Sequence, residues 1–284
     1  MRTTDAPGRR RSGRVATAVA LAGVVSVGAL ALSACGGPTA ATESTEAMTV
    51  TPVRGELVLE FDEGLSAEGD SMERIQSSGT ATLRIGVSTA GGGFLERVEG
   101  RSGYAVRTPA FTATGKTPAA VLVIKPRGAD QLSPGTRPVR WGIDMMLDEE
   151  QGDAPADNGD NLLQRGLFDH QAQIKLQIDH DVPSCRVRGS EGEALVVAET
   201  AVERGVWYRL ACQLRGDELS LTVGLPGRPA PQRWSVPASV GSIEFRRSEP
   251  VAIGGKVDRR GNIQPRDTDQ FNGLLDNVYL DISS

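Results

Sequence analysis

The sequence is poor in the residue types that mark several protein classes. Of its 284 residues only 4% are aromatic, 2 are histidine and 3 are cysteine. A single apolar run approaches the length of a membrane span, which excludes a polytopic membrane protein. The formal net charge of −5 argues against a nucleic-acid partner, because proteins that bind nucleic acids are normally basic. With 39% hydrophobic residues, the chain still has enough apolar content to form a core.

The first 34 residues are typical of an export signal. Four arginines between residues 9 and 14 precede an uncharged apolar stretch over residues 15–32, and the sequence Leu-Ser-Ala-Cys then ends at Cys35. This order resembles the lipobox of bacterial lipoproteins, which implies cleavage before Cys35 and a lipid on its sulfur. An uncleaved single-pass anchor is the alternative reading, and the general secretory and twin-arginine export routes both stay open.

Residues 35–54 comprise the lipidated cysteine and a linker of small and polar residues, a composition typical of a flexible tether. We expect the lipid to attach the protein to the cell membrane, with the following domain on the extracytoplasmic face. The excess of arginine over lysine, 27 against 4, is typical of GC-rich coding of the actinobacterial type.

The two remaining cysteines are Cys185 and Cys212. An even number of cysteines in an oxidising compartment predicts a disulfide between them, worth roughly 3–4 kcal/mol on the chain-entropy model. Two buried free thiols are the alternative. A zinc site is disfavoured because no histidine or third cysteine lies at ligand spacing.

A period of two dominates the apolar pattern of residues 55–284. Apolar side chains alternate with mostly polar ones over residues 57–61, 139–147, 174–178 and 219–223, as in half-buried strands. Turn signals separate these segments, and no amphipathic helix longer than two turns is evident. Because parallel α/β folds need helical crossovers, the sequence predicts an antiparallel β-sandwich in one domain.

Several motifs in this region occur in an order that resembles a known fold. A G-x-W motif at 205–207 is followed by I-G-G at 253–255 and by F-x-G-x-x-D-x-V at 271–278. Their order and spacing resemble the laminin G-like, concanavalin A-like jelly roll over roughly residues 55–284. The resemblance implies two stacked antiparallel sheets, with any ligand site on a concave face or a sheet rim. It implies no particular ligand, because this architecture serves many functions.

Asp276 is the most informative acidic residue. Alternation along the strand places Asp276 on the same face as Leu274 and Val278, which should be buried. A buried carboxylate needs a cation or several hydrogen-bond donors. In folds that the sequence resembles, a calcium ion often ties the last strand to the first, where Asp62 lies. We therefore expect Asp276 and Asp62 to form a structural calcium site or a hydrogen-bonded staple, with backbone donors or arginine as the alternative to calcium.

Catalytic patterns are weak. Hydrolases of this architecture carry three carboxylates on one strand, but here the first position is Gly142, and Asp144 and Asp148 lie roughly 13 Å apart along the strand. The two histidines, His170 and His180, lie beside aspartates without a nucleophile motif. We therefore predict no enzymatic activity.

Other candidate ligand residues are few. The acidic run over residues 148–160 lacks the alternating spacing of a calcium loop, and we expect it to be a solvated hairpin. Trp141, Trp207 and Tyr208 are expected in the core. Trp234 lies in a polar, edge-like context and is the candidate for sugar stacking.

These observations together predict a lipid-anchored, non-catalytic binding module on the extracytoplasmic face, with a glycan or a surface protein as its partner. A degenerate or unrecognised glycoside hydrolase and a structural envelope protein are the alternatives. Calcium is the one cofactor that the sequence suggests.

Overall fold

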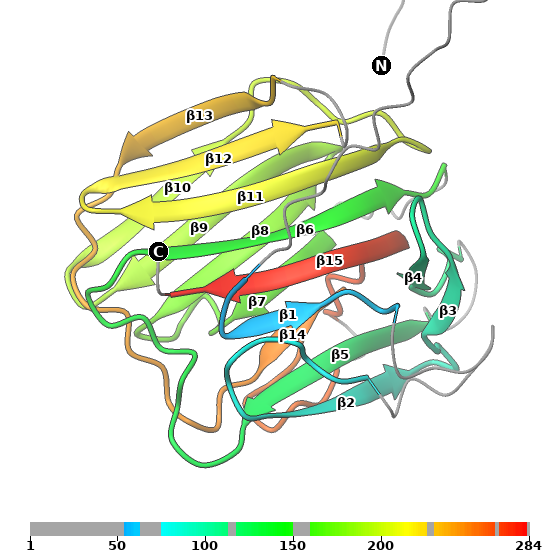
Figure 1. The fold of residues 1–284 in the computed structure, drawn as a ribbon, viewed down its shortest axis with the longest axis horizontal. Coiled ribbons are helices and arrows are strands. Elements are labelled where there is room, and N and C mark those ends of the chain that lie inside the picture. Colours follow the sequence, from blue (N-terminus) through cyan, green and yellow to red (C-terminus); the bar gives the residue numbers. More distant parts are fainter. Residues whose placement is uncertain are drawn as a thin grey trace, which may run out of the picture. The chain divides into compact units, whose positions relative to one another are not determined.

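The computed structural model describes residues 54–62, 75–112, 118–149, 160–225, 230–264 and 267–282. These segments form fifteen β-strands in two stacked antiparallel sheets, which confirms the predicted jelly-roll sandwich (Figure 1). The described segments include no helix long and apolar enough to cross a membrane. Cys35, the export signal and most of the linker lie outside the described residues.

The first sheet has eight strands in the order β13-β12-β11-β6-β15-β4-β3, and β1 also pairs with β15. Their bounds are β1 Leu57–Leu59, β3 Glu96–Glu99, β4 Tyr104–Arg107, β6 Val139–Leu147, β11 Trp207–Arg215, β12 Glu218–Gly224, β13 Gln232–Pro237 and β15 Gly273–Asp281.

The second sheet has seven strands in the order β10-β9-β8-β7-β14-β5-β2. Their bounds are β2 Leu83–Ala90, β5 Ala119–Pro126, β7 Asp160–Arg165, β8 Gln173–Asp179, β9 Val182–Gly189, β10 Gly192–Val197 and β14 Val251–Ile253. Strands β7 to β10 follow one another along the chain as neighbours, whereas β14 reaches its place between β7 and β5 from much later in the sequence.

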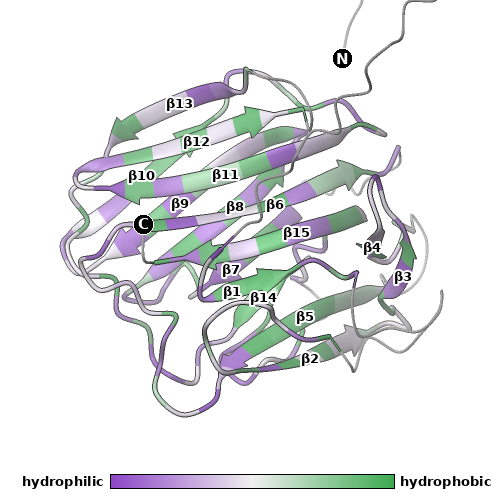
Figure 2. Ribbon diagram, viewed as in Figure 1, coloured by the Kyte–Doolittle hydropathy of each residue, from purple (hydrophilic) through white to green (hydrophobic). Residues whose placement is uncertain are grey.

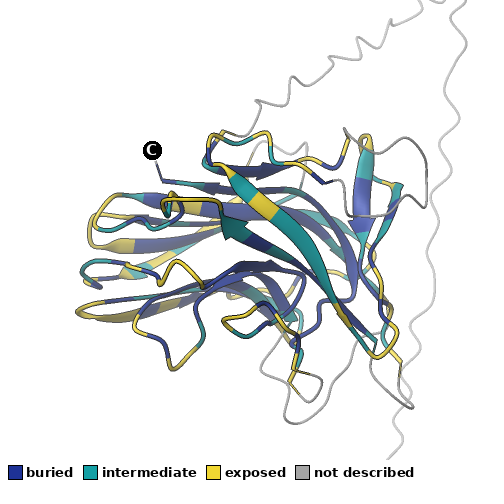
Figure 3. Ribbon diagram, turned by 90° about the horizontal axis from the view of Figure 1, so that it is seen from below, coloured by how far each residue is buried: buried dark blue, intermediate teal, exposed yellow. Residues whose placement is uncertain are grey.

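The core lies between the sheets and is built from alternate residues of each strand. In β6 the inward residues include Trp141 and Ile143, and in β8 they are Ile174, Leu176 and Ile178, all essentially inaccessible to solvent. The apolar positions alternate along the strands in Figure 2, and the buried surfaces face each other in Figure 3. The predicted period of two is therefore confirmed in these strands.

A disulfide joins Cys185 of β9 to Cys212 of β11, as predicted. The two strands belong to different sheets, so the bond crosses the core and fastens one sheet to the other. Both cysteines are fully buried in the main hydrophobic cluster, and their Cα atoms lie 5.8 Å apart.

A β-bulge in β15 changes the face that Asp276 occupies. The register with β6 shifts between Asp276 and Tyr279, and Asn277 has a φ of 49°, in the left-handed region. Leu275 and Val278 both point into the core as a result, and Asp276 lies on the outer face of the sheet. The prediction that Asp276 shares a face with Val278 is therefore wrong, because the extra residue reverses the alternation.

Asp276 is nevertheless buried on that outer face. Its carboxylate accepts hydrogen bonds from the backbone N of Asn277 at 2.7 Å and from the Asn277 side chain at 3.0 Å. Asp144 faces it on β6 and is held by the Arg209 guanidinium at 2.6 and 2.7 Å. Burial, with the negative charges of Asp144 and Asp62 nearby, raises the pKa of Asp276 to about 8.

Replacing both bridging cysteines by alanine should lower the free energy of unfolding by about 2–4 kcal/mol, because the cross-link restricts the unfolded chain. Thermal or urea unfolding measures the difference. Reduction of the wild-type protein provides the control and should lower Tm in the same direction. Equal unfolding curves for the oxidised protein and the double variant would contradict the stabilising role.

Asp276→Asn should change how stability depends on pH. The folded protein holds a proton on Asp276 up to about pH 8, whereas the unfolded chain releases it near pH 4, so wild-type stability falls as pH rises through this window. Asparagine has no titrating proton, so the stability of the variant does not fall for this reason as pH rises. The stability of the variant relative to wild type should therefore increase by a few kcal/mol, in order of magnitude, between pH 4 and pH 8.5.

Urea unfolding of both proteins across this pH range measures the difference. Asp217→Asn, in the exposed turn between β11 and β12, is the matched control and should follow the wild-type pH profile. Parallel pH profiles for Asp276→Asn and wild type would contradict a raised pKa at Asp276.

Candidate functional site

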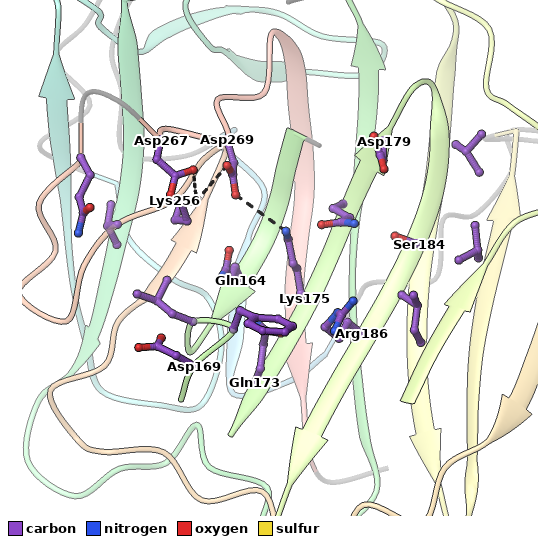
Figure 4. Close-up of a pocket in the computed structure, with 18 residues that line it drawn as sticks. Gln164, Asp169, Gln173, Lys175, Asp179, Ser184, Arg186, Lys256, Asp267 and Asp269 are labelled. Carbon is purple, nitrogen blue, oxygen red and sulfur yellow. Dashed lines mark hydrogen bonds and ion pairs between the residues drawn. The ribbon is translucent and has the colours of Figure 1, made fainter. Parts of the chain in front are cut away.

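A groove of about 730 Å³ lies over the outer face of the seven-stranded sheet. Its floor comes from β7, β8, β9 and β10. Parts of its rim come from residues 167–169 and from Lys256, Val257, Gln264, Asp267 and Asp269. Figure 4 shows Lys175 pointing from β8 toward Asp269 on the rim, with the other floor side chains around it. The floor uses the outward positions of strands whose alternate residues build the core.

Strand register places the floor residues side by side. Gln164, Lys175, Arg186 and Leu195 are successive partners from β7 to β10 and form one row across the sheet. A parallel row contains Gln177, Ser184 and Val197. Each row therefore runs from polar side chains at β7 or β8 to an apolar side chain at the edge strand β10.

Lys175 lies near the middle of the groove and is only 9% exposed. Its Nζ atom lies 3.9 Å from Oδ2 of Asp269, beyond hydrogen-bond distance (Figure 4). Burial lowers the pKa of Lys175 to about 8, and the attraction of Asp269 offsets only part of that loss. The groove thus holds a desolvated ammonium group with spare capacity to donate hydrogen bonds.

Two carboxylates of the rim, those of Asp267 and Asp269, are held within the protein. Lys256 bonds to Asp267 and lies 3.1 Å from Oδ1 of Asp269 (Figure 4). The Asn161 side chain donates to Oδ2 of Asp269 at 3.2 Å. Burial raises the pKa of Asp269, while Lys175 and Lys256 oppose that shift. The acidic rim is therefore a paired network.

Two amide side chains of β8 present acceptors without a partner among the described residues. Oε1 of Gln173 and Oε1 of Gln177 are both buried atoms that accept no hydrogen bond there. The other end of Gln173 is fixed, because its Nε2 donates to the Gly166 carbonyl at 3.2 Å. Gln173 is 2% exposed and lines the groove, so its unpartnered oxygen lies just beneath the groove surface. A buried acceptor left unsatisfied costs about 1–3 kcal/mol, which a donor from a ligand would recover.

The groove also has exposed apolar side chains. Phe168, Leu195 and Val197 line the groove with exposures of 65%, 41% and 47%, and they are three of the four exposed large hydrophobic side chains in the described segments. Arg186 and Arg188 lie over the Phe168 ring, with guanidinium carbons 5.5 and 4.9 Å from its centroid. Exposed apolar side chains gathered in one place are typical of interaction sites.

The residues predicted for calcium lie on the other sheet, away from this groove. Asp62 is exposed, and its Oδ1 accepts from the backbone N of Tyr104 at 2.7 Å, while Asn277 donates to Asp276. Calcium takes six to eight oxygen ligands, and in the described part of the chain no three acidic, histidine or cysteine side chains converge to hold a metal. The observed donors satisfy Asp62 and Asp276 separately, and within the segments that the structure describes no hydrogen bond links the two residues. A shared site with calcium stays a prediction.

The carboxylates considered for hydrolysis are engaged by arginines. Asp144 is bound by Arg209, and Asp148 accepts two bonds from Arg107 at 2.7 and 3.0 Å. Both lie in or next to β6, in the sheet that does not carry the groove.

The two histidines lie in separate environments. His170 is buried beside Glu249, with 2.8 Å between Nδ1 and Oε1. His180 is exposed and bonds to its neighbour Asp179 at 2.6 Å, in the turn that follows β8. Most of the acidic run at 148–160 lies outside the described residues.

The aromatic residues divide between the core and the outer surface. Trp141 is fully buried and Tyr208 packs against the core, as predicted. Trp207 alternates with Tyr208 and is only partly buried, so its prediction as a core residue is wrong. Trp234 pairs with Leu221 and packs against the main core, which leaves it away from the groove.

The groove was not predicted from the sequence. Lys175 and Gln177 alternate with buried residues, but alternation alone does not distinguish a solvated face from a binding surface. The available signal was the composition of one outward face, Gln173, Lys175, Gln177 and Asp179, together with the apolar outward residues of β10.

No family model and no curated protein matches the sequence. Among solved structures, the binding domain of botulinum neurotoxin DC in complex with rat synaptotagmin II is 7% identical, with a TM-score of 0.50 over 80% of this chain and 48% of that chain. The binding domain of Paraclostridial Mosquitocidal Protein 1 is 11% identical, with a TM-score of 0.48 over 79% of this chain and 48% of that chain. The LG1-3 region of the laminin alpha2 chain is 6% identical, with a TM-score of 0.42 over 79% of this chain and 60% of that chain.

This chain spans about half the length of the two toxin binding domains that it matches. At such low identity these likenesses concern the fold alone. The chain is therefore an antiparallel β-sandwich of the jelly-roll type, and any assignment of a ligand rests on its own groove.

Proposed function

We propose that this protein is a non-catalytic binding module and that the groove over the seven-stranded sheet takes a glycan. The main support is that one cavity of about 730 Å³ is lined both by Gln173 and Gln177, whose buried amide oxygens have no partner among the described residues, and by the desolvated ammonium group of Lys175. Ligand sites are typically concave, with a few placed polar groups beside an apolar wall. A glycan fits this concave site better than a second protein surface, which would need a flatter and larger contact area.

The state of the acidic side chains supports a role without catalysis. General acid catalysis needs a carboxyl group free to give its proton to the leaving group. In the groove, Asp267 and Asp269 are bound by Lys256, and Asp179 is bound by His180. Asp169 is exposed at the groove rim, and on the other sheet Asp144 is bound by Arg209. A weak or unrecognised hydrolase and a structural envelope protein remain the competing functions, and the binding experiment below separates them.

We also propose that Cys35 carries the lipid and that the domain works on the extracytoplasmic side of the cell membrane. The basic and apolar residues before Cys35 support this, as does the internal disulfide, since disulfides persist mainly in oxidising compartments. The lipid would supply the attachment to the membrane, and the groove would be left free for its ligand.

Cys35→Ala should abolish incorporation of labelled palmitate into the protein, because the thiol that receives the lipid is gone. Metabolic labelling followed by immunoprecipitation measures the incorporation, with the Cys185→Ala/Cys212→Ala protein as the control that should still be labelled. Equal labelling of Cys35→Ala and wild type would contradict lipidation at this residue.

Lys175→Met should weaken glycan binding by about 10-fold or more, because a hydrogen bond from a charged donor is lost. A panel of oligosaccharides, assayed with the full chain for binding and for release of reducing ends, measures this. Lys125→Met is the matched control, because Lys125 lies on β5 of the same sheet outside the groove. We expect binding without release.

Release of reducing ends that Asp144→Asn abolishes would instead favour the hydrolase. A protein that neither binds nor cleaves any member of the panel would favour the structural role. Equal affinities of wild type and Lys175→Met would place the ligand elsewhere on the molecule.

A further inference from the structure

The lining of the groove also indicates which class of glycan it would bind, an inference that rests on the function proposed above. This lining contains four carboxylates, of Asp169, Asp179, Asp267 and Asp269, against three cations, Lys175, Arg186 and Lys256. Lys256 is paired with Asp267 and Asp269, and Arg186 lies 3.5 Å from Glu193. Tight binding of a strongly anionic ligand needs several uncompensated cations, which this arrangement does not offer.

The unpaired hydrogen-bonding capacity lies along β8 instead. Gln173 and Gln177 line the groove, and each has a buried Oε1 atom that accepts no hydrogen bond from the described residues. Lys175 lies between them, and its ammonium group has only a long contact to Asp269. Residues two apart on a strand point to the same face and lie about 6.6 Å apart, so the three groups form a row of acceptor, donor and acceptor. A hydroxyl group both donates and accepts, so a ligand with several hydroxyls can satisfy the whole row.

Apolar side chains of the groove offer a second kind of contact. Leu195 and Val197 end the two rows that contain Lys175 and Gln177, and Phe168 lines the same cavity. These side chains are exposed by 41%, 47% and 65%, and covering them with the C–H face of a sugar ring would remove apolar surface from water. The ligand that fits therefore has a hydroxylated edge and an apolar face, without a net charge.

We propose that the groove binds an uncharged saccharide, with its hydroxyl groups on the row formed by Gln173, Lys175 and Gln177 and with a C–H face on Phe168, Leu195 and Val197. An uncharged ligand forms no charge pair with Lys175, so its affinity should change little with salt concentration, since screening acts on charge pairs. An acidic saccharide of the same length would bring its negative charge to a lining that has more carboxylates than cations.

The first test is Gln177→Leu, measured in the full chain with a panel of neutral glucose, galactose, mannose and arabinose oligomers. Removing an unsatisfied buried oxygen should leave Tm unchanged or raise it, whereas affinity for the neutral oligomer should fall by about 3- to 10-fold. These opposite signs separate a ligand contact from a structural role. Gln213→Leu, at a half-buried position on β11 of the other sheet, is the matched control and should leave affinity unchanged.

The second test addresses the apolar wall. Leu195→Ser should lower affinity for the same oligomer by a few-fold with no loss of Tm, since the side chain is already partly exposed. Phe94→Ser is the matched control, because Phe94 is 66% exposed and does not line the groove. Unchanged affinity in both Gln177→Leu and Leu195→Ser would overturn the proposed contacts.

The third test compares the neutral oligomers with uronic-acid oligomers of equal length at low and high salt. Tighter binding of the neutral class, with little salt dependence, would support the inference. Tighter binding of the uronic-acid class, weakened by salt, would overturn the inference and leave the proposed glycan-binding function in place. Failure of both classes to bind would overturn the proposed function itself.

Discussion

Packing of the two sheets against each other uses one face of every central strand, and this constraint determines which side chains can meet a ligand. In β8, Ile174, Leu176 and Ile178 point into the core. The residues between them have to point outward, so Gln173, Lys175 and Gln177 lie on one face of the sheet. The same requirement acts on β9 and β10, and the groove floor is thus the outer side of the strands that build the core.

The parts of this structure that depend on local alternation could be predicted from the sequence. The apolar residues of segments 139–147 and 174–178 recur every second position, and the structure places them inward. The disulfide followed from the number of cysteines and the expected compartment. The jelly-roll fold followed from the order of weak motifs, each of which marks a turn or a strand end.

The features that were not predicted depend on departures from the alternation of side chains or on contacts between residues far apart in the sequence. Asn277, with a left-handed backbone, forms a bulge that reverses which residues of β15 point inward. An asparagine within an apolar strand does not by itself predict a bulge. The groove forms because Lys256, Asp267 and Asp269, which follow β14 in the sequence, lie beside β7. That neighbourhood joins residues about a hundred positions apart, so no local pattern reveals it.

The position of the disulfide has a consequence for the groove. Cys185 points inward between Ser184 and Arg186, two residues that line the groove from β9. The covalent link to the opposite sheet therefore limits the freedom of a strand that lines the groove, and a site that is already ordered loses less entropy when it binds. For the function proposed above, reduction of the disulfide would loosen the groove floor and weaken binding, although every lining side chain would stay chemically intact.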